Sequence, residues 1–173
     1  MEYKELRKSL LFGMIVVAFL GTLFHFVYDW SGQNTIVGFL FPTNESTWEH
    51  MKLVYLPMLI LTILFYCMYD IKNKVYETVF WMATIIGPWI LPVILYTYRG
   101  ILGFGVMWMD TATYYICLVV ITILMLFAMK YIGEMEVPVI NFCLRIIAGL
   151  MGLLFIWFSY NPLNLGIFQA VAQ

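Results

Sequence analysis

Two short polar segments in an otherwise apolar chain hold the side chains best suited to metal or proton chemistry. The first contains His25 and Asp29, which are four residues apart and share a face if both lie on one helix. A carboxylate beside an imidazole fixes its tautomer and raises its basicity. The alternative reading is an interfacial histidine with a carboxylate that sits in water.

The second segment, Pro42 to Lys52, is the densest polar stretch of the sequence. Its candidate binding residues are Asn44, Glu45, Glu49 and His50. Glu45 and Glu49 are four residues apart and are predicted to share a helical face. Two carboxylates with one or two imidazoles can hold a divalent cation or relay protons. Helix capping explains the segment about as well, because Ser46 and Glu49 fit a capping box and Glu45 in a first turn suits the helix dipole.

The connection between the two segments is short. Since the stretch from Trp30 to Pro42 leaves little room for separation, the helices on either side of it should be neighbours. We therefore predict one shared site, and a divalent metal is a candidate ligand. The predicted metal ligands are His25, Glu45, Glu49 and His50.

Three further ionisable residues lie in or beside apolar segments, where charges are costly and tend to mark function. We expect Arg145 to snorkel to the lipid headgroups, with a buried carboxylate or a lipid phosphate as the alternative partner. Asp110 is expected to be the N-cap of a helix, and Arg99 an anchor at the membrane interface.

Composition determines the fold class that must position these residues. The chain has 173 residues, of which 64% are hydrophobic and only 11% charged. Soluble domains carry about 25% charged residues. We predict an all-α integral membrane bundle that forms a single transmembrane domain over residues 1–173. Runs long enough to cross the bilayer lie near 9–29, 46–69, 77–98, 111–130 and 137–160.

Two connections are more apolar than ordinary loops. They cover residues 33–43 and 100–110, and we expect them to be re-entrant or interfacial segments, with six spans as the alternative count. Pro88 and Pro92 should kink the third span.

Basic residues set the expected orientation, with the N-terminus in the cytoplasm and the C-terminus outside. In this orientation six basic residues lie inside, two outside and one within the last span. The inner ones are Lys4, Arg7, Lys8, Lys72, Lys74 and Lys130. The polar segments then lie at the outer side.

The runs His25-Phe26-Val27-Tyr28-Asp29-Trp30-Ser31-Gly32 and Asn44 to Lys52 resemble the signature of an uncharacterised family. Its members are small bacterial multi-span membrane proteins that form a domain of unknown function. The resemblance implies a multi-pass protein of the bacterial cytoplasmic membrane and directs attention to His25 and to Glu45 through His50. It implies no activity.

Three functions agree with these observations. The first is an outward-facing pocket that binds or transports a cation or a small polar solute. The second is a membrane-embedded, metal-dependent hydrolase or transferase acting on a lipid or peptide, and the third is a structural or accessory subunit. The expected partners are membrane lipid and a small ligand or cation. The sequence is also compatible with a homo-oligomer. It has no basic stripe of the kind that indicates nucleic-acid binding, so we expect no nucleic-acid partner.

Overall fold

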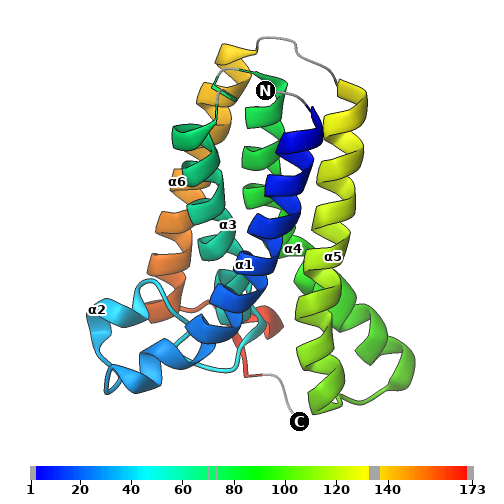
Figure 1. Cartoon of the computed structure of the whole chain (residues 1–173). Coiled ribbons are helices and arrows are strands. Elements are labelled where there is room, and N and C mark those ends of the chain that lie inside the picture. Colours follow the sequence, from blue (N-terminus) through cyan, green and yellow to red (C-terminus); the bar gives the residue numbers. More distant parts are fainter. Residues whose placement is uncertain (1–2, 70, 73, 133–136, 171–173) are drawn as a thin grey trace.

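The structure is a computed structural model, and it describes residues 3–69, 71–72, 74–132 and 137–170. The described residues form six α-helices and one short 3-10 helix, with no strand among them (Figure 1). The elements are α1 (Tyr3–Trp30), α2 (Thr35–Gly38), α3 (Thr47–Met68), α4 (Val75–Leu102), α5 (Met107–Ile132), α6 (Pro138–Tyr160) and η1 (Gly166–Phe168).

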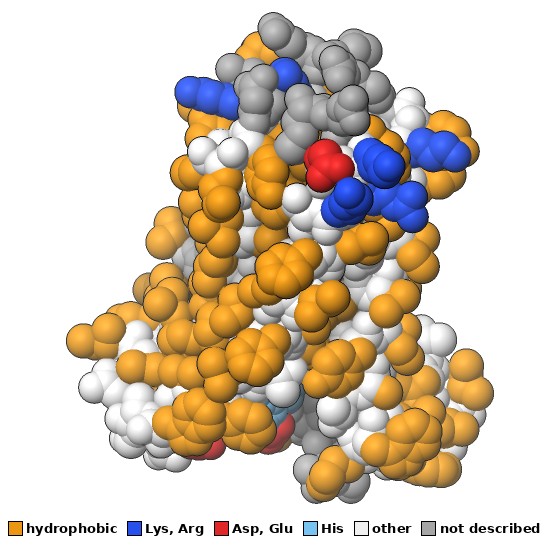
Figure 2. All heavy atoms as spheres, viewed as in Figure 1, with side chains coloured by type: hydrophobic (Ala, Val, Ile, Leu, Met, Phe, Trp, Pro, Cys, Tyr) orange, Lys and Arg blue, Asp and Glu red, His pale blue; other side chains and the backbone are white. Residues whose placement is uncertain are grey.

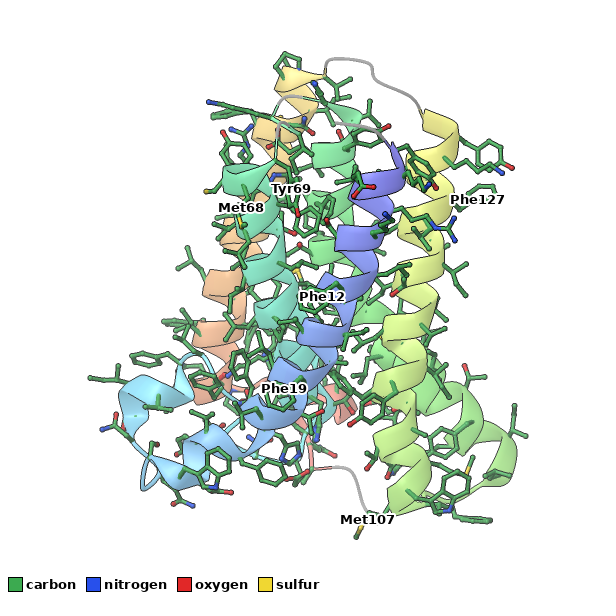
Figure 3. The ribbon with its side chains drawn as sticks, viewed as in Figure 1. Phe12, Phe19, Met68, Tyr69, Met107 and Phe127 are labelled. Atoms are coloured by element: carbon green, nitrogen blue, oxygen red, sulfur yellow. The ribbon has the colours of Figure 1, made fainter. Side chains whose placement is uncertain are left out.

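Five of these helices are long and apolar enough to cross a membrane. The shortest, α3, has 22 residues. At 1.5 Å per residue it is about 33 Å long, which exceeds the hydrocarbon thickness of about 30 Å. Hydrophobic side chains cover most of the face in Figure 2, and Phe12, Phe19 and Phe127 point away from the bundle in Figure 3. The predicted all-α membrane bundle is confirmed.

The helices differ from the predicted segments mainly at their ends. α4 continues to Leu102 and α5 begins at Met107, so the predicted re-entrant or interfacial segment at 100–110 is helical except for a four-residue connection. The other such segment, 33–43, contains the short helix α2, which Asn34 caps through its side chain. Asp110 lies in the first turn of α5, so the prediction that it caps this helix is wrong, because the helix starts earlier.

α3 and α4 are the most buried helices, and α1, α5 and α6 pack around them. The core between them is apolar and includes the fully buried side chains of Leu10, Met58 and Phe80. α4 changes direction along its length in Figure 1, as Pro88 and Pro92 lead one to expect.

The end of α1, the start of α3, the end of α4 and the start of α5 all lie at the end of the bundle opposite the N-terminus (Figure 1). Lys and Arg side chains gather at the N-terminal end instead (Figure 2). The polar segments identified in the sequence therefore meet at one end of the molecule.

Candidate metal centre

A sharp reversal of the chain after α1 brings the two histidines together. Gly32 and Gln33 adopt positive φ values of 70° and 60°, which turn the backbone directly after the helix ends. Ser46 then caps α3, because its side chain accepts a hydrogen bond from the backbone N–H of Glu49 at 3.3 Å. His50 thus lies in the first turn of α3, opposite the last turns of α1.

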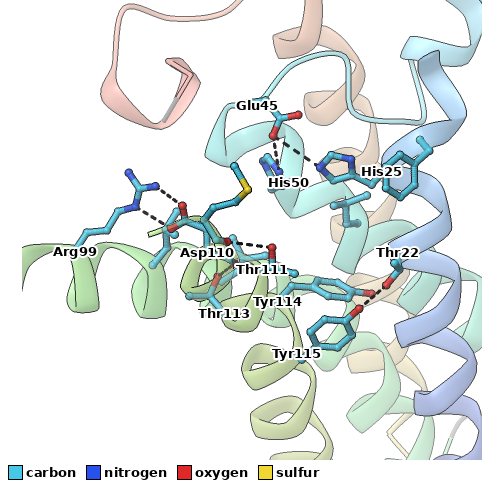
Figure 4. Close-up of a pocket in the computed structure, with 16 residues that line it drawn as sticks. Thr22, His25, Glu45, His50, Arg99, Asp110, Thr111, Thr113, Tyr114 and Tyr115 are labelled. Carbon is cyan, nitrogen blue, oxygen red and sulfur yellow. Dashed lines mark hydrogen bonds and ion pairs between the residues drawn. The ribbon is translucent and has the colours of Figure 1, made fainter. Parts of the chain in front are cut away.

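His25, Glu45 and His50 form a compact cluster (Figure 4). Glu45 Oε2 lies 3.3 Å from Nε2 of His50 and 3.8 Å from Nε2 of His25. One ligand atom from each of the three residues can be chosen so that all lie within 4.8 Å of one another. Three separate segments of the chain, namely α1, the loop before α3, and α3 itself, each supply one of them.

A hydrogen bond to the backbone fixes the orientation of the His50 ring. Its Nδ1 lies 2.8 Å from the carbonyl oxygen of Ser46, and since a carbonyl only accepts, Nδ1 must carry the hydrogen. Nε2 is therefore the nitrogen that faces Glu45. Metal-binding histidines in proteins are commonly oriented by such a bond from the other ring nitrogen. Either a proton or a metal ion on Nε2 can bridge to the carboxylate.

Glu45 lies in the loop outside the spanning helices, and its carboxylate is kept ionised by its neighbours. The hydrogen bond with His50 is the main cause that holds the pKa of Glu45 below its ordinary value, against the opposing effect of partial burial. Positive charge on either imidazole lowers this pKa further. The cluster therefore offers an anionic oxygen between two ring nitrogens.

Glu49, the fourth predicted ligand, is placed apart from this cluster. Its buried carboxylate pairs with Lys52 at 2.9 Å and accepts hydrogen bonds from Ser159 Oγ at 2.7 Å and Thr43 N–H at 2.8 Å. Lys52 also donates to the carbonyl of Gly38. Glu49 thus joins α3, α6 and the loop before α3, a role that stabilises the frame around the site.

The remaining polar residues of the two segments also lie outside the cluster. Asp29 is exposed near the end of α1, and the ion-pair partner of His25 is Glu45 instead. The Asn44 side chain accepts a hydrogen bond from the backbone N–H of Ser46 at 2.9 Å, which stabilises the turn before α3.

Arg99 and Asp110 form an ion pair between the end of α4 and the start of α5, at 3.0 Å from Nε to Oδ1. Tyr98 also donates a hydrogen bond to this carboxylate. Arg99 is therefore more than an interface anchor. The pair lies across a cavity from the His25, Glu45 and His50 cluster (Figure 4).

Arg145 lies far from the site, at the other end of the bundle. It pairs with Glu77, whose side chain is completely buried, at 2.8 Å from Nε to Oε1. The predicted snorkelling of Arg145 is wrong, and the alternative, neutralisation of a buried carboxylate, is what the structure has. Asn141 and Trp81 donate to the same carboxylate, so this cluster joins α4 and α6.

The cavity beside the candidate metal centre has a volume of about 470 Å³ and is bordered by α1, α3, α4 and α5. Its lining includes Thr22, Tyr114 and Tyr115, which the sequence analysis did not single out. Hydroxyls of Thr22 and Tyr115 lie 3.0 Å apart, which links α1 to α5. The only signal for Tyr114 and Tyr115 in the sequence was that two tyrosines stand side by side within an apolar segment.

The fold defines a multi-pass helical membrane protein. The chain belongs to the Family of unknown function (DUF6512), whose family model matches residues 1–173. This agrees with the resemblance seen in the sequence. No curated protein and no solved structure matches the chain.

Proposed function

We propose that this membrane protein binds a divalent transition-metal cation, with zinc as the best example, through His25, Glu45 and His50. The observation that carries the proposal is the grouping of three ligand atoms within 4.8 Å of one another. Zinc lies about 2.0–2.2 Å from nitrogen and oxygen ligands, so ligand atoms around a tetrahedral ion are about 3.3 Å apart. The spacing from His50 to Glu45 is 3.3 Å already.

The ligand types favour this class of metal over magnesium or calcium. Those two ions prefer all-oxygen sites, whereas imidazole suits zinc, copper, iron and nickel. Two of the three candidate ligands are imidazoles. Glu45 adds one negative charge that partly balances a divalent cation.

The orientation that we propose puts the N-terminus in the cytoplasm and the site on the outer side of the bacterial cytoplasmic membrane. It is supported by the basic residues, which gather at the end of the bundle opposite the cluster (Figure 2). These include Lys4, Arg7, Lys8 and Lys130.

The packing beneath the cavity supports binding rather than passage in this conformation. Along the same helices toward the N-terminal end, Met14, Met58, Leu61 and Met125 are buried in the apolar core. A cation that crossed the protein would have to open this core, because charges are costly in such surroundings.

Metal analysis of purified protein tests the proposal. Protein in non-ionic detergent is stripped with a chelator, titrated with zinc by calorimetry, and analysed for metal by mass spectrometry. We expect one zinc per chain, and an affinity at least tenfold lower for His25→Ala, Glu45→Gln and His50→Ala. Asp29→Asn is the matched control, because it removes an exposed carboxylate one turn from His25. Equal zinc binding by His50→Ala and the wild type would refute the assignment.

A metal-dependent hydrolase is a second candidate, because three protein ligands leave a fourth position open toward the cavity. This is the arrangement of catalytic zinc, which activates a bound water. The zinc-loaded protein would then hydrolyse ester or amide substrates, and His50→Ala would abolish the activity while Asp29→Asn kept it. If the protein binds zinc but hydrolyses none of the ester and amide substrates tested, the hydrolase candidate is refuted and metal binding is the remaining function.

A further inference from the structure

The cavity beside the candidate metal centre is polar at one end and apolar at the other. His25, Glu45 and His50 lie at the end of the bundle, with the pair of Arg99 and Asp110 opposite them (Figure 4). The deeper lining is mostly apolar, and the hydroxyls of Thr22 and Tyr115 in it are paired with each other. It includes Leu53, one turn beyond His50 on α3, and Leu91 and Leu95, which precede Arg99 on α4. Such a lining matches a ligand that is itself amphiphilic.

The cavity also has a side that faces out of the bundle. Phe26 on α1 and Met107 and Tyr115 on α5 line the cavity, yet their side chains are 47%, 66% and 43% exposed. Since these helices cross the membrane, surface of this kind adjoins lipid. The hydrogen bond between Thr22 and Tyr115 joins α1 to α5 deeper in the membrane. A hydrocarbon chain can therefore leave the cavity between α1 and α5 on the outer side of this contact, beside Phe26 and Met107.

The charge balance of the metal-loaded site favours an anion. Arg99 and Asp110 neutralise each other. A divalent metal would outweigh the single negative charge of Glu45, while the two imidazoles bind as neutral ligands. One net positive charge is then left in a largely apolar cavity, with one coordination position unfilled by protein. A phosphate or carboxylate group balances this positive charge, and one of its oxygens fills the open coordination position.

We infer that this cavity binds an anionic single-chain amphiphile, whose phosphate or carboxylate group reaches the metal and whose hydrocarbon chain leaves between α1 and α5. The inference rests on the proposed function, because the metal supplies the positive charge. A volume of about 470 Å³ lies in the range of small-molecule pockets. It accommodates a head group and the first part of one chain, and the rest of the chain extends into the lipid.

Native mass spectrometry of the delipidated protein in non-ionic detergent tests the inference, because it counts zinc and lipid on the same molecule. The probes are lysophosphatidate, the uncharged monoacylglycerol of equal chain length, and inorganic phosphate. We expect lysophosphatidate to bind the zinc-bound protein at least tenfold more tightly than monoacylglycerol or inorganic phosphate does. Lysophosphatidate should also bind the zinc-bound protein at least tenfold more tightly than it binds the zinc-free protein.

A variant that fills the apolar part of the cavity supplies the second arm. Leu95→Phe should keep zinc and lose the lysophosphatidate adduct. Val93→Phe is its matched control, because this residue of α4 is 65% exposed on the outside of the bundle. If Leu95→Phe fails to fold, the comparison of probes on wild-type protein still decides the question.

The outcomes separate the two proposals. Protein that binds no zinc at all overturns the proposed function and the inference together. Zinc binding combined with equal retention of lysophosphatidate and monoacylglycerol overturns the inference alone. Inorganic phosphate that binds as tightly as lysophosphatidate also overturns it, because the site would then recognise a free anion without a hydrocarbon chain.

Discussion

The imidazole rings of His25 and His50 lie with their centroids 5.3 Å apart, although one ring belongs to the end of α1 and the other to the start of α3. Glu45 approaches both rings from the intervening loop. A cation held by these three side chains would therefore also tie α1 to α3, and metal binding should be coupled to the stability of the bundle.

Zinc should raise the melting temperature of the wild-type protein. A ligand that binds only the folded state at 100 times its dissociation constant stabilises by about 2.7 kcal/mol. For a chain of this size that corresponds to an increase of roughly 5–10 °C. Intrinsic tryptophan fluorescence during heating measures the shift. His25→Ala should show almost no zinc-dependent increase, and an equal increase in that variant would contradict the coupling.

Glu49→Gln should destabilise the protein but leave zinc binding unchanged. The substitution leaves the ammonium group of Lys52 buried without its counter-charge, and breaking a buried pair in this way costs about 3–5 kcal/mol. Asp29→Asn, at an exposed position, should have little effect. Thermal unfolding and zinc content per folded molecule are the readouts. A folded Glu49→Gln protein that lost zinc would show that Glu49 is a ligand after all.

The placement of Glu49 illustrates which parts of the site follow from sequence. The short connection after α1 correctly predicted that His25 and His50 meet. The spacing of Glu45 and Glu49 wrongly predicted that they share a helical face. Glu45 precedes Thr47, the first residue of α3, and therefore lies outside the helix. Within a helix, consecutive residues such as Glu49 and His50 are about 100° apart around the axis. Adjacent residues thus serve different sites.

The five spans could be predicted because apolar runs of sufficient length have few other uses. The ion pairs could not. Arg145 finds Glu77 only through the packing of α6 against α4, and no local pattern specifies the relative register of these two helices. Likewise, Asp110 pairs with Arg99 because α4 and α5 extend further than their hydrophobic cores indicated.

Glu77→Gln should destabilise the bundle by about 3 kcal/mol, since it removes the counter-charge of Arg145 from a buried cluster. Part of the cost is relieved because the Arg145 side chain is partly exposed and can turn outward. Glu5→Gln breaks the exposed pair with Lys8 and should change stability by less than about 0.5 kcal/mol. Chemical unfolding in detergent compares the two variants, and equal effects would argue against a stabilising role of the buried cluster.

Gly21→Ala should loosen the contact of α1 with its neighbours. A Cβ at this position would lie 2.5 Å from the carbonyl oxygen of Leu53 and closer still to the hydroxyl of Tyr114. Overpacking of this kind typically costs about 1–3 kcal/mol. Gly149→Ala is the control, because a Cβ there meets no atom within 4 Å. If both variants melt at the wild-type temperature, the close approach of α1 to α5 is not required for stability.

The most direct test of the metal centre is anomalous diffraction at the zinc edge from crystals of the zinc-loaded protein. The account predicts one strong peak about 2.0–2.2 Å from Nε2 of His25, Nε2 of His50 and a carboxylate oxygen of Glu45. A zinc peak at other residues, or none in zinc-saturated crystals, would contradict it.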